Sequence, residues 1–385
     1  MQDIRPPTNV NPLGCRLSGG EPSLRDAARR TPAAIPSLRA CRARSHLVLL
    51  GTGVHLVTYM RISVTDRCNE RCAYCLPHDV AVEWLPKGQI LTYEEILRVA
   101  RVATSLGVTK FRVTGGEPLV RRNVTEFIGE LNQLPGVTDI GLSTNATLLA
   151  PLAHKLRANG VNKVNISLDT LDAGKYRELS GTGNLADALA GIDAATEAGF
   201  PQVKLNMVLM KGKNDDEVFD LIEFAREKAV TLRFIELMPI STSEVLTDDN
   251  FISVNHVRHR IEKRYELVPL PEPPTEVRGN GPALYYEVSG LTNRSGQPVR
   301  LGFIGAMTNL HFCDTCNKVR LTADGKLRPC LGAHLEYDLK PVLRARDSSD
   351  AHVREVFVQT IRNKPEEHEF RNNYVPGRKM IAIGG

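Results

Sequence analysis

Three cysteines in one short segment are the first feature of this sequence that could do chemistry. Cys68, Cys72 and Cys75 lie in DRCNERCAYCLP, residues 66–77, with three and two residues between them. Structural zinc would need a fourth ligand in a closed tetrahedron, and His78 is the nearby candidate. An iron–sulfur cluster held by three thiolates instead leaves one iron open to a further molecule. We favour the cluster, because it explains why three cysteines suffice.

A second triplet lies near the other end of the chain, in HFCDTCNKVRLTADGKLRPCL, and comprises Cys313, Cys316 and Cys330. The remaining cysteines, Cys15 and Cys41, are isolated from both triplets. This distribution indicates metal ligation in a reducing compartment better than a disulfide framework. A zinc ribbon completed by His311 or His334 is the alternative for the second triplet.

Length and charge limit the possible functions. The chain has 385 residues, enough for two domains, and no apolar run approaches the roughly 20 residues that a membrane helix needs. The formal net charge of +5 lies entirely in residues 1–45, which contain eight arginines and three acids, so the rest of the chain is neutral. A nucleic-acid-binding protein would carry its basic patch in the folded body. We therefore expect neither nucleic acid nor a membrane as a partner.

The N-terminal region, residues 1–45, shows no apolar periodicity among its arginines, prolines and serines. It is predicted to be a disordered extension or a targeting segment. The neutral body fits a cytoplasmic location. A mitochondrial matrix location is the alternative if residues 1–45 form a transit peptide, although the acids in this region weaken that case.

The elements that must position the cysteines come from a regular alternation between residues 59 and 236. Short β-rich runs are separated by helical stretches such as residues 92–107 and 184–199, and the runs lie at 59–66, 109–114, 138–144, 163–169, 203–210 and 231–237. Such an alternation predicts a parallel sheet with right-handed crossovers, either a barrel or a doubly wound sheet. The first cysteine triplet directly follows the first run, at the edge where active sites of these folds collect.

Residues within the predicted strands alternate between apolar and polar side chains. One face of these strands is polar and partly cationic, and includes Arg61, Ser63, Arg112, Thr114, Asn165, Ser167, Lys204 and Asn206. If the apolar face meets the helices, the interior is polar, unlike the packed core of a closed eight-stranded barrel. A wide, incomplete barrel around an anionic guest would explain this pattern. Edge strands with a polar face in water are the alternative.

The alternation lapses from about residue 241. Residues 269–282 are predicted to form a proline-rich turn region, and residues 283–290 with 299–305 a hairpin that leads into the second cysteine triplet. We therefore predict an N-terminal extension (1–45), a partial barrel (46–240) and a smaller C-terminal domain (241–385) that closes the open side of the barrel.

The first half of the sequence resembles the radical S-adenosylmethionine superfamily. Its CxxxCxxC signature matches the first triplet, with Tyr74 before the last cysteine, and TGGEP at 114–118 resembles the segment that holds the methionine amino group. Gly115 and Gly116 would let the backbone approach a ligand closely. The resemblance implies an incomplete (β/α)6 TIM-type barrel and a 4Fe-4S cluster whose open iron binds S-adenosyl-L-methionine. One-electron cleavage then gives a 5′-deoxyadenosyl radical.

Residues 46–385 together resemble the MoaA-type GTP 3′,8-cyclases. The resemblance is carried by CNKVRLTADG at 316–325, by the second triplet and by the terminal Gly384-Gly385. It implies a lyase that converts GTP to (8S)-3′,8-cyclo-7,8-dihydroguanosine 5′-triphosphate, the first step of molybdenum cofactor (molybdopterin) biosynthesis. It also implies a second 4Fe-4S cluster, whose open iron binds guanine. The implied partners are GTP, an electron donor and the downstream cyclic pyranopterin monophosphate synthase, with a homodimer possible.

Site roles follow from the resemblance, position by position. The catalytic residues would be Arg61, Arg320, Gly384 and Gly385. S-adenosylmethionine would contact Tyr74, Gly116, Ser167 and Met238. GTP would contact Arg61, Arg112, Ser143, Lys204, Lys318, Val319 and Arg320. Strand parity supports part of this independently, since it directs Arg61, Arg112 and Lys204 inward, where a triphosphate would need them.

Three positions depart from the family pattern. Lys318 stands where an arginine is usual and loses the planar fork of donors, Ser143 replaces a threonine, and Glu70 replaces an apolar residue. Two other interpretations remain beside the main one. The first is another radical enzyme with an auxiliary cluster, such as a peptide maturase, and the second is a non-enzymatic module that binds zinc. The complete CNKVRLTADG segment argues against the first.

Overall fold

The computed structural model describes residues 56–77, 81–241, 245–273, 281–372 and 374–384. The predicted N-terminal extension, residues 1–45, lies outside the described residues, as do His78 and Gly385.

Six parallel strands form the middle of a curved sheet and follow one another in chain order. They are β1 (Tyr59–Ser63), β2 (Lys110–Thr114), β3 (Asp139–Thr144), β4 (Val161–Ser167), β5 (Gln202–Leu209) and β6 (Thr231–Glu236). Every predicted strand is confirmed, with ends that differ by up to three residues. The parallel register aligns Arg61 with Arg112, and Asn165 with Lys204, so these side chains share one face.

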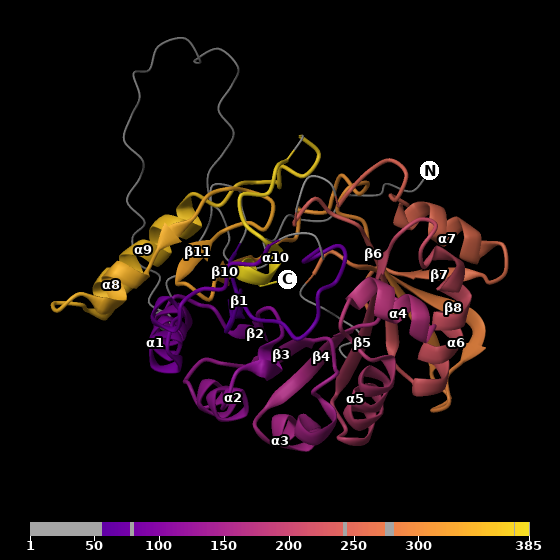
Figure 1. The fold of residues 1–385 in the computed structure, drawn as a ribbon, viewed down its shortest axis with the longest axis horizontal. Helices are drawn as coiled ribbons and strands as arrows, with labels where there is room; N and C mark the ends of the chain where they lie inside the picture. The colour runs from indigo at the N-terminus through magenta and orange to yellow at the C-terminus, as the bar shows by residue number, and fades with distance from the viewer. Residues whose placement is uncertain (1–55, 78–80, 242–244, 274–280, 373, 385) are drawn as a thin grey trace, which may run out of the picture. The chain divides into compact units, whose positions relative to one another are not determined.

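Helices connect these strands and cover the outer side of the sheet (Figure 1). They are α1 (Tyr93–Ser105), α2 (Val124–Asn132), α3 (Ala153–Ala158), α4 (Ala173–Ser180), α5 (Leu185–Glu197) and α6 (Val218–Lys228). Helix α1 begins at a capping box, in which the Thr92 side chain accepts from the Glu95 N–H and the Glu95 carboxylate accepts from the Thr92 N–H. Its apolar residues Ile96 and Val99 are fully buried against the sheet.

Strands from the last third of the chain extend the sheet at both edges. At one edge, β9 (Pro298–Ile304) lies parallel to β6, and β8 (Leu284–Thr292) and β7 (Leu267–Leu270) lie beyond it in the sheet. At the other edge, β10 (Lys318–Leu321) lies parallel to β1, and β11 (Lys326–Arg328) and β12 (Tyr337–Asp338) lie beyond it. The predicted hairpin is confirmed as the antiparallel pair β8–β9. The turn region predicted from residue 269 begins later, because Pro269 and Leu270 belong to β7, an edge strand where a proline is tolerated.

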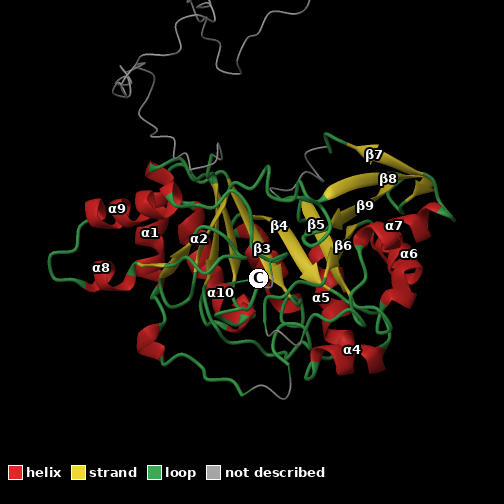
Figure 2. Ribbon diagram, turned by 90° about the horizontal axis from the view of Figure 1, so that it is seen from above, coloured by secondary structure: helices red, strands yellow, loops and turns green. Residues whose placement is uncertain are grey.

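The C-terminal part adds α7 (Val254–Glu262), α8 (Lys340–Arg344), α9 (Asp350–Arg362) and the short α10 (Met380–Ile383). Helix α9 packs beside α1, where Arg98 and Asp350 form an ion pair of 2.8 Å. Helix α10 lies on the inner side of the sheet, close to β1 and β2 (Figures 1 and 2). No helix among the described residues has the length and apolarity that crossing a bilayer would require.

The apolar core lies between the sheet and its outer helices. Met60, Ile62, Phe111 and Val113 are at most 1% exposed and belong to this core. The residues that alternate with them face the inside of the curve. The incomplete barrel with a polar interior is therefore confirmed.

Candidate active site

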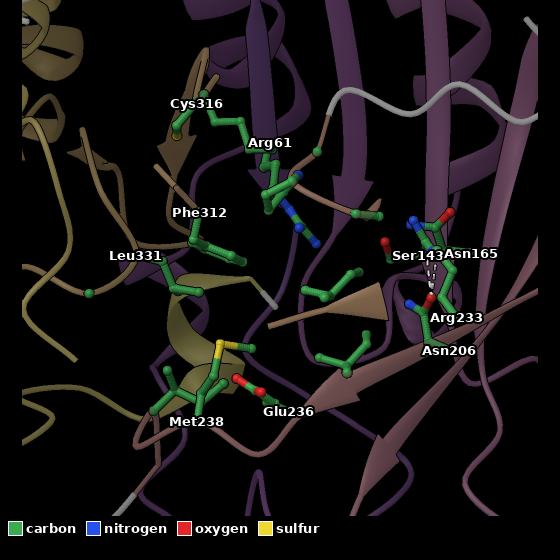
Figure 3. A pocket seen from close by; sticks show the side chains of 18 of the residues that line it. Arg61, Ser143, Asn165, Asn206, Arg233, Glu236, Met238, Phe312, Cys316 and Leu331 are labelled. Carbon is green, nitrogen blue, oxygen red and sulfur yellow. Dashed lines mark hydrogen bonds between the residues drawn. The ribbon is translucent and has the colours of Figure 1, made fainter. Parts of the chain in front are cut away.

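The inner side of the sheet encloses a cavity of about 290 Å³ that is lined by basic side chains. Seven of them come from six strands, and they are Arg61, Arg112, Lys163, Lys204, Arg233, Lys318 and Arg320. Figure 3 shows Arg61 directed into the cavity, with Ser143, Asn165, Asn206 and Arg233 on one side of the view and Cys316, Phe312, Leu331 and Met238 on the other. The cavity thus has a polar, cationic part and a part lined by sulfur and apolar groups.

The positive charge is poorly compensated within the cavity. Glu236 is the one acid among the described lining residues, and its carboxylate already accepts from the backbone N–H groups of Val254 (3.1 Å), Met307 (2.8 Å) and Thr308 (3.1 Å). Lys163, also in the lining, forms an ion pair with Asp139 at 2.6 Å. The cavity is therefore suited to a multiply charged anion.

Burial and mutual repulsion act on these cations. Burial and then the charge of Arg320 lower the pKa of Arg61. Burial and then the charges of Arg233 and Arg112 lower the pKa of Lys204. Both shifts show that the protonated side chains are under electrostatic strain, which a bound anion would relieve.

Arg112 is fixed by its neighbours on β1 and β3. Its Nε donates to the Tyr59 hydroxyl at 2.6 Å and its Nη1 to the Leu142 carbonyl at 2.8 Å. A Cβ at Gly141 would lie 2.7 Å from the guanidinium carbon, so a side chain at this position would displace the Arg112 guanidinium. Burial alone would raise the pKa of Tyr59, but the charges of Arg112 and Arg61 outweigh it and lower the pKa.

Neighbouring side chains also hold Lys204 and Arg233 in place. The Lys204 ammonium donates to the Tyr285 hydroxyl on β8 at 3.0 Å. Arg233 donates through Nε and Nη2 to Asn206 Oδ1 at 2.9 and 2.6 Å (Figure 3). Arg233 and Lys163 have the inward parity of their strands, a signal that could have found both. Tyr285 could not be found in this way, because its position depends on β8 joining the sheet.

The second cysteine triplet lines the same cavity. Cys313 and Cys316 lie in the loop before β10, where the Cys316 N–H donates to the Cys313 carbonyl at 2.9 Å, and Cys330 follows β11. Burial would raise the pKa of Cys316, but the charges of Lys364 and Lys318 outweigh it and lower the pKa. Positive charge around Cys316 favours its thiolate, the form that binds metal, whereas burial raises the pKa of Cys313 and of Cys330.

The first triplet lies in the loop after β1 and is tied to the end of α4, because the N–H groups of Arg71 and Ala73 donate to the carbonyls of Ser180 and Leu179 at 2.8 Å each. Cys72 lines a smaller cavity together with Tyr74 and Ser167, and these two residues also line the large cavity. The two cavities therefore adjoin.

Two buried carboxylates support the cysteine loop. The Tyr74 hydroxyl donates to Asp169 at 2.9 Å, and the Tyr176 hydroxyl donates to Glu70 at 2.9 Å. Burial raises the pKa of Glu70 to about 7. Glu70, the departure from the family pattern, thus packs as a buried hydrogen-bonding group, and a Cβ at Gly183 would overlap its carboxylate.

The two triplets fit iron–sulfur clusters by the chemistry of their donors. Each offers three thiols, all partly buried, and thiolates are the ligands that such clusters use. Among the described residues, no group of three or more histidine, cysteine or acidic side chains is arranged to hold a single metal ion. Of the proposed fourth zinc ligands, His311 is exposed and paired with Asp314, and His334 stacks on Tyr374.

The TGGEP segment packs against the first cysteine loop. The Gly116 N–H donates to the Thr65 carbonyl at 2.9 Å, and a Cβ at Gly116 would overlap the Arg67 carbonyl. Glu117 accepts from the Asn145 N–H at 2.8 Å and so connects this segment to the end of β3. The close backbone approach predicted for these glycines exists, and in the structure its partner is the cysteine loop.

The C-terminal tail reaches both parts of the site. The Gly384 carbonyl accepts from Arg320 Nη1 at 2.6 Å, and the Ile381 N–H donates to the Cys75 thiol. Gly384 has a φ of +73°, and a Cβ there would lie 2.8 Å from Thr114 Cγ2. Gly384 thus contacts Arg320, which lines the cavity, although Gly384 itself is outside this lining.

Most of the predicted contact residues line the large cavity, namely Arg61, Tyr74, Arg112, Ser143, Ser167, Lys204, Met238, Lys318 and Arg320. Gly116 is outside this lining. The Val319 side chain is fully buried in the apolar core, on the opposite face of β10 from Lys318 and Arg320, so a nucleotide contact from Val319 would have to come from its backbone.

Comparisons with known proteins agree over both halves of the chain. Residues 62–225 match the Radical SAM superfamily, and residues 230–370 match the Molybdenum Cofactor Synthesis C family. A "GTP 3',8-cyclase" of Syntrophomonas wolfei subsp. wolfei is 42% identical over 86% of this chain and 98% of its own length. The "GTP 3',8-cyclase" of Moorella thermoacetica is 43% identical over 86% of this chain and 98% of its own length.

Among solved structures, Streptococcus suis SuiB bound to S-adenosylmethionine is similar with a TM-score of 0.50 and 15% identity, over 77% of this chain and 68% of that chain. At this identity the likeness concerns the fold alone.

Proposed function

Because this chain belongs to the GTP 3′,8-cyclase family of radical S-adenosylmethionine enzymes, we propose that its cationic cavity binds GTP between the two cysteine triplets. The protein is a lyase of molybdenum cofactor biosynthesis, and it converts GTP to (8S)-3′,8-cyclo-7,8-dihydroguanosine 5′-triphosphate. Its cofactors are two 4Fe-4S clusters and S-adenosyl-L-methionine. The observation that carries the proposed site is that, among the described residues, seven basic side chains line the cavity together with a single acid that is already engaged.

The triphosphate is assigned to the polar part of the cavity. Arg112, Lys204 and Arg233 are each held there by a hydroxyl or amide, so their donors are oriented before the ligand arrives. Arg61 lies between the two parts and would contact phosphate or ribose. Preorganised cations of this kind bind phosphate at a low cost in side-chain entropy.

The guanine base is assigned to the other part of the cavity. Phe312 and Leu331 form an apolar wall there, next to the thiols of Cys316 and Cys330. Cys313, Cys316 and Cys330 would hold a cluster there by three thiolates and would leave it able to bind the base. Lys318, with its ammonium above the Tyr59 ring, lies on the same strand as Arg320 and would add one donor to the nucleotide.

S-adenosylmethionine is assigned to the junction of the two cavities. Tyr74 and Ser167 line both, and Met238 lines the large one. One-electron cleavage of S-adenosylmethionine is the chemistry that the first cluster supplies when bound. The adjoining cavities would place the cleaved group next to the ribose of GTP.

The tail closes the site from the inner side of the sheet. Gly384 orients Arg320 through its carbonyl, and α10 covers Cys75. Both contacts would keep water from the reacting atoms and hold Arg320 toward the nucleotide. The same role is proposed for Gly385.

We further propose an electron donor, a downstream cyclic pyranopterin monophosphate synthase, a homodimer, a cytoplasmic location and a domain boundary near residue 240. Strands on both sides of that boundary belong to one sheet, so the two regions would fold as one unit.

The test compares cysteine variants of the two triplets. Cys72→Ala should abolish formation of 5′-deoxyadenosine while the second cluster stays loaded. Cys313→Ala should disturb GTP positioning, so that slow, uncoupled 5′-deoxyadenosine forms without cyclised product. Both compounds are measured by liquid chromatography with mass spectrometry, and Cys41→Ala serves as the control cysteine outside the triplets. Cleavage by the first variant, or normal product from the second, would contradict the assignment.

A further inference from the structure

Lys364, just after α9, buries its ammonium beneath the second cysteine triplet. The residue is 3% exposed. Its Nζ lies 3.5 Å from the Cys316 sulfur and donates to the carbonyls of Lys318 at 3.0 Å and Pro329 at 2.6 Å. Burying a charged side chain is costly unless it is well hydrogen-bonded, and these contacts meet that requirement.

The three contacted atoms belong to two separate segments. Lys318 is the first residue of β10, and Cys316 lies two residues before it. Pro329 lies between the end of β11 and Cys330. The ladder between β10 and β11 pairs Arg320 with Arg328 and stops before the cysteines. Lys364 therefore connects the two cysteine-bearing segments beyond the last backbone pair.

The contact with sulfur also has an electrostatic consequence. Reducing an iron–sulfur cluster adds a negative charge, and hydrogen bonds to its sulfurs set its reduction potential. An ammonium that donates to a ligand sulfur stabilises the reduced form more than the oxidised form. Its two carbonyl contacts hold the ammonium in that position.

We propose that Lys364 is a positioning residue for the second cluster, which fixes Cys316 and Cys330 relative to each other and raises the reduction potential of the cluster through its bond to the Cys316 sulfur. The inference rests on the second cluster of the proposed function. It assigns Lys364 no contact with GTP.

The test uses full-length protein in which Cys68, Cys72 and Cys75 are changed to alanine, so that the second cluster is observed alone. Lys364→Met should lower the ratio of reduced to oxidised cluster at a fixed potential by about tenfold, the lower end of what a charge-assisted hydrogen bond contributes. For one electron this corresponds to a midpoint about 59 mV lower. The ratio is followed by electron paramagnetic resonance in a mediated titration, without GTP or S-adenosylmethionine.

Two further variants sharpen the test. Arg362→Met removes an exposed cation from the last turn of α9, two residues before Lys364, and should leave the midpoint unchanged. Lys364→Arg keeps the charge and should restore iron loading and most of the potential. If Lys364→Met fails to fold by circular dichroism, Lys364→Gln replaces it, because glutamine keeps a donor but not the charge.

Each result decides the question. A lowered midpoint, or loss of second-cluster iron from a folded Lys364→Met that Lys364→Arg reverses, supports the proposal. An unchanged midpoint with full iron content overturns it, as does a folded Lys364→Arg that holds no iron. If the parent protein with an intact second triplet holds no iron, the proposed function itself is contradicted, so the two failures are distinguishable.

Discussion

Replacing Lys204 by methionine should stabilise the nucleotide-free protein while weakening its hold on GTP. Lys204 is 1% exposed, and the charges of Arg233 and Arg112 oppose its protonated form. Methionine has a similar length and no charge, so it fits the same space without the repulsion. The gain in stability and the loss of GTP affinity have the same cause, because Lys204 is a buried cation positioned for an anionic ligand.

The magnitudes follow from the surroundings of the ammonium. Two unit charges about 7 Å apart repel by about 2 kcal/mol at an effective dielectric constant of about 20. Loss of the hydrogen bond to Tyr285 offsets about 1 kcal/mol of this gain. The free energy of unfolding should therefore rise by about 1 kcal/mol and the melting temperature by about 2 °C. A lost charge-assisted hydrogen bond to phosphate costs about 1.5–3 kcal/mol, or about 10- to 150-fold in Kd.

Lys163→Met is the matched control on the neighbouring strand. Lys163 also lines the cavity, but Asp139 compensates its charge at 2.6 Å. Its removal leaves that carboxylate without its cation, and the melting temperature should fall. Thermal melts by circular dichroism and anaerobic titration calorimetry with GTP measure both variants. A lower melting temperature together with unchanged GTP affinity in Lys204→Met would refute the reasoning.

Two further predictions concern the tail and its anchor. Gly384→Ala should reduce turnover at least about tenfold with iron content and GTP affinity unchanged, because a side chain at φ +73° costs about 1 kcal/mol and its Cβ would meet Thr114. Gly296→Ala is the control, since Gly296 has the same φ and open space around it. Equal losses of turnover in both variants would count against a role for the tail. Arg378→Met should lower the melting temperature at pH 7 and reduce its fall as the pH drops below about 4. Burial would raise the pKa of Asp324, but the hydrogen bond from Arg378 outweighs it and lowers the pKa. A carboxylate with a lowered folded pKa stabilises the fold above its unfolded value near 4 and loses this as pH falls through the folded value. If the melting temperatures of Arg378→Met and of the unchanged protein are the same at every pH, the Arg378–Asp324 pair does not stabilise the fold.

The alternation of polar and apolar residues along the strands predicted cavity residues that the cysteine motifs alone do not indicate. Alternation with a period of two placed Arg61, Arg112 and Lys204 on one face, and the structure puts all three in the cavity. The same rule places Val319 opposite Lys318 and Arg320, so the buried position of its side chain was available from the sequence. Local periodicity is reliable for β1 to β6, because their apolar side packs in the core and their polar side faces the cavity.

Contacts between distant segments could not be predicted in this way. The pairing of β8 with β9 and of β9 with β6 brings Tyr285 to Lys204, and the packing of α9 against β11 brings Lys364 to Cys316. No periodicity in the last third of the chain indicates which edge of the sheet each strand joins. The engagement of Glu236 by three backbone N–H groups also depends on a loop that follows β9.

The central claim is that two clusters and a cationic cavity together rebuild GTP, and a single anaerobic measurement tests it most directly. Full-length protein is reconstituted with iron and sulfide, its metal content is determined, and it is then incubated with GTP, S-adenosylmethionine and a reductant. The account predicts about eight irons per chain, together with 5′-deoxyadenosine and cyclised nucleotide detected by mass spectrometry. A colourless protein that holds zinc, or an iron-loaded protein that cleaves S-adenosylmethionine and leaves GTP unchanged, would contradict it.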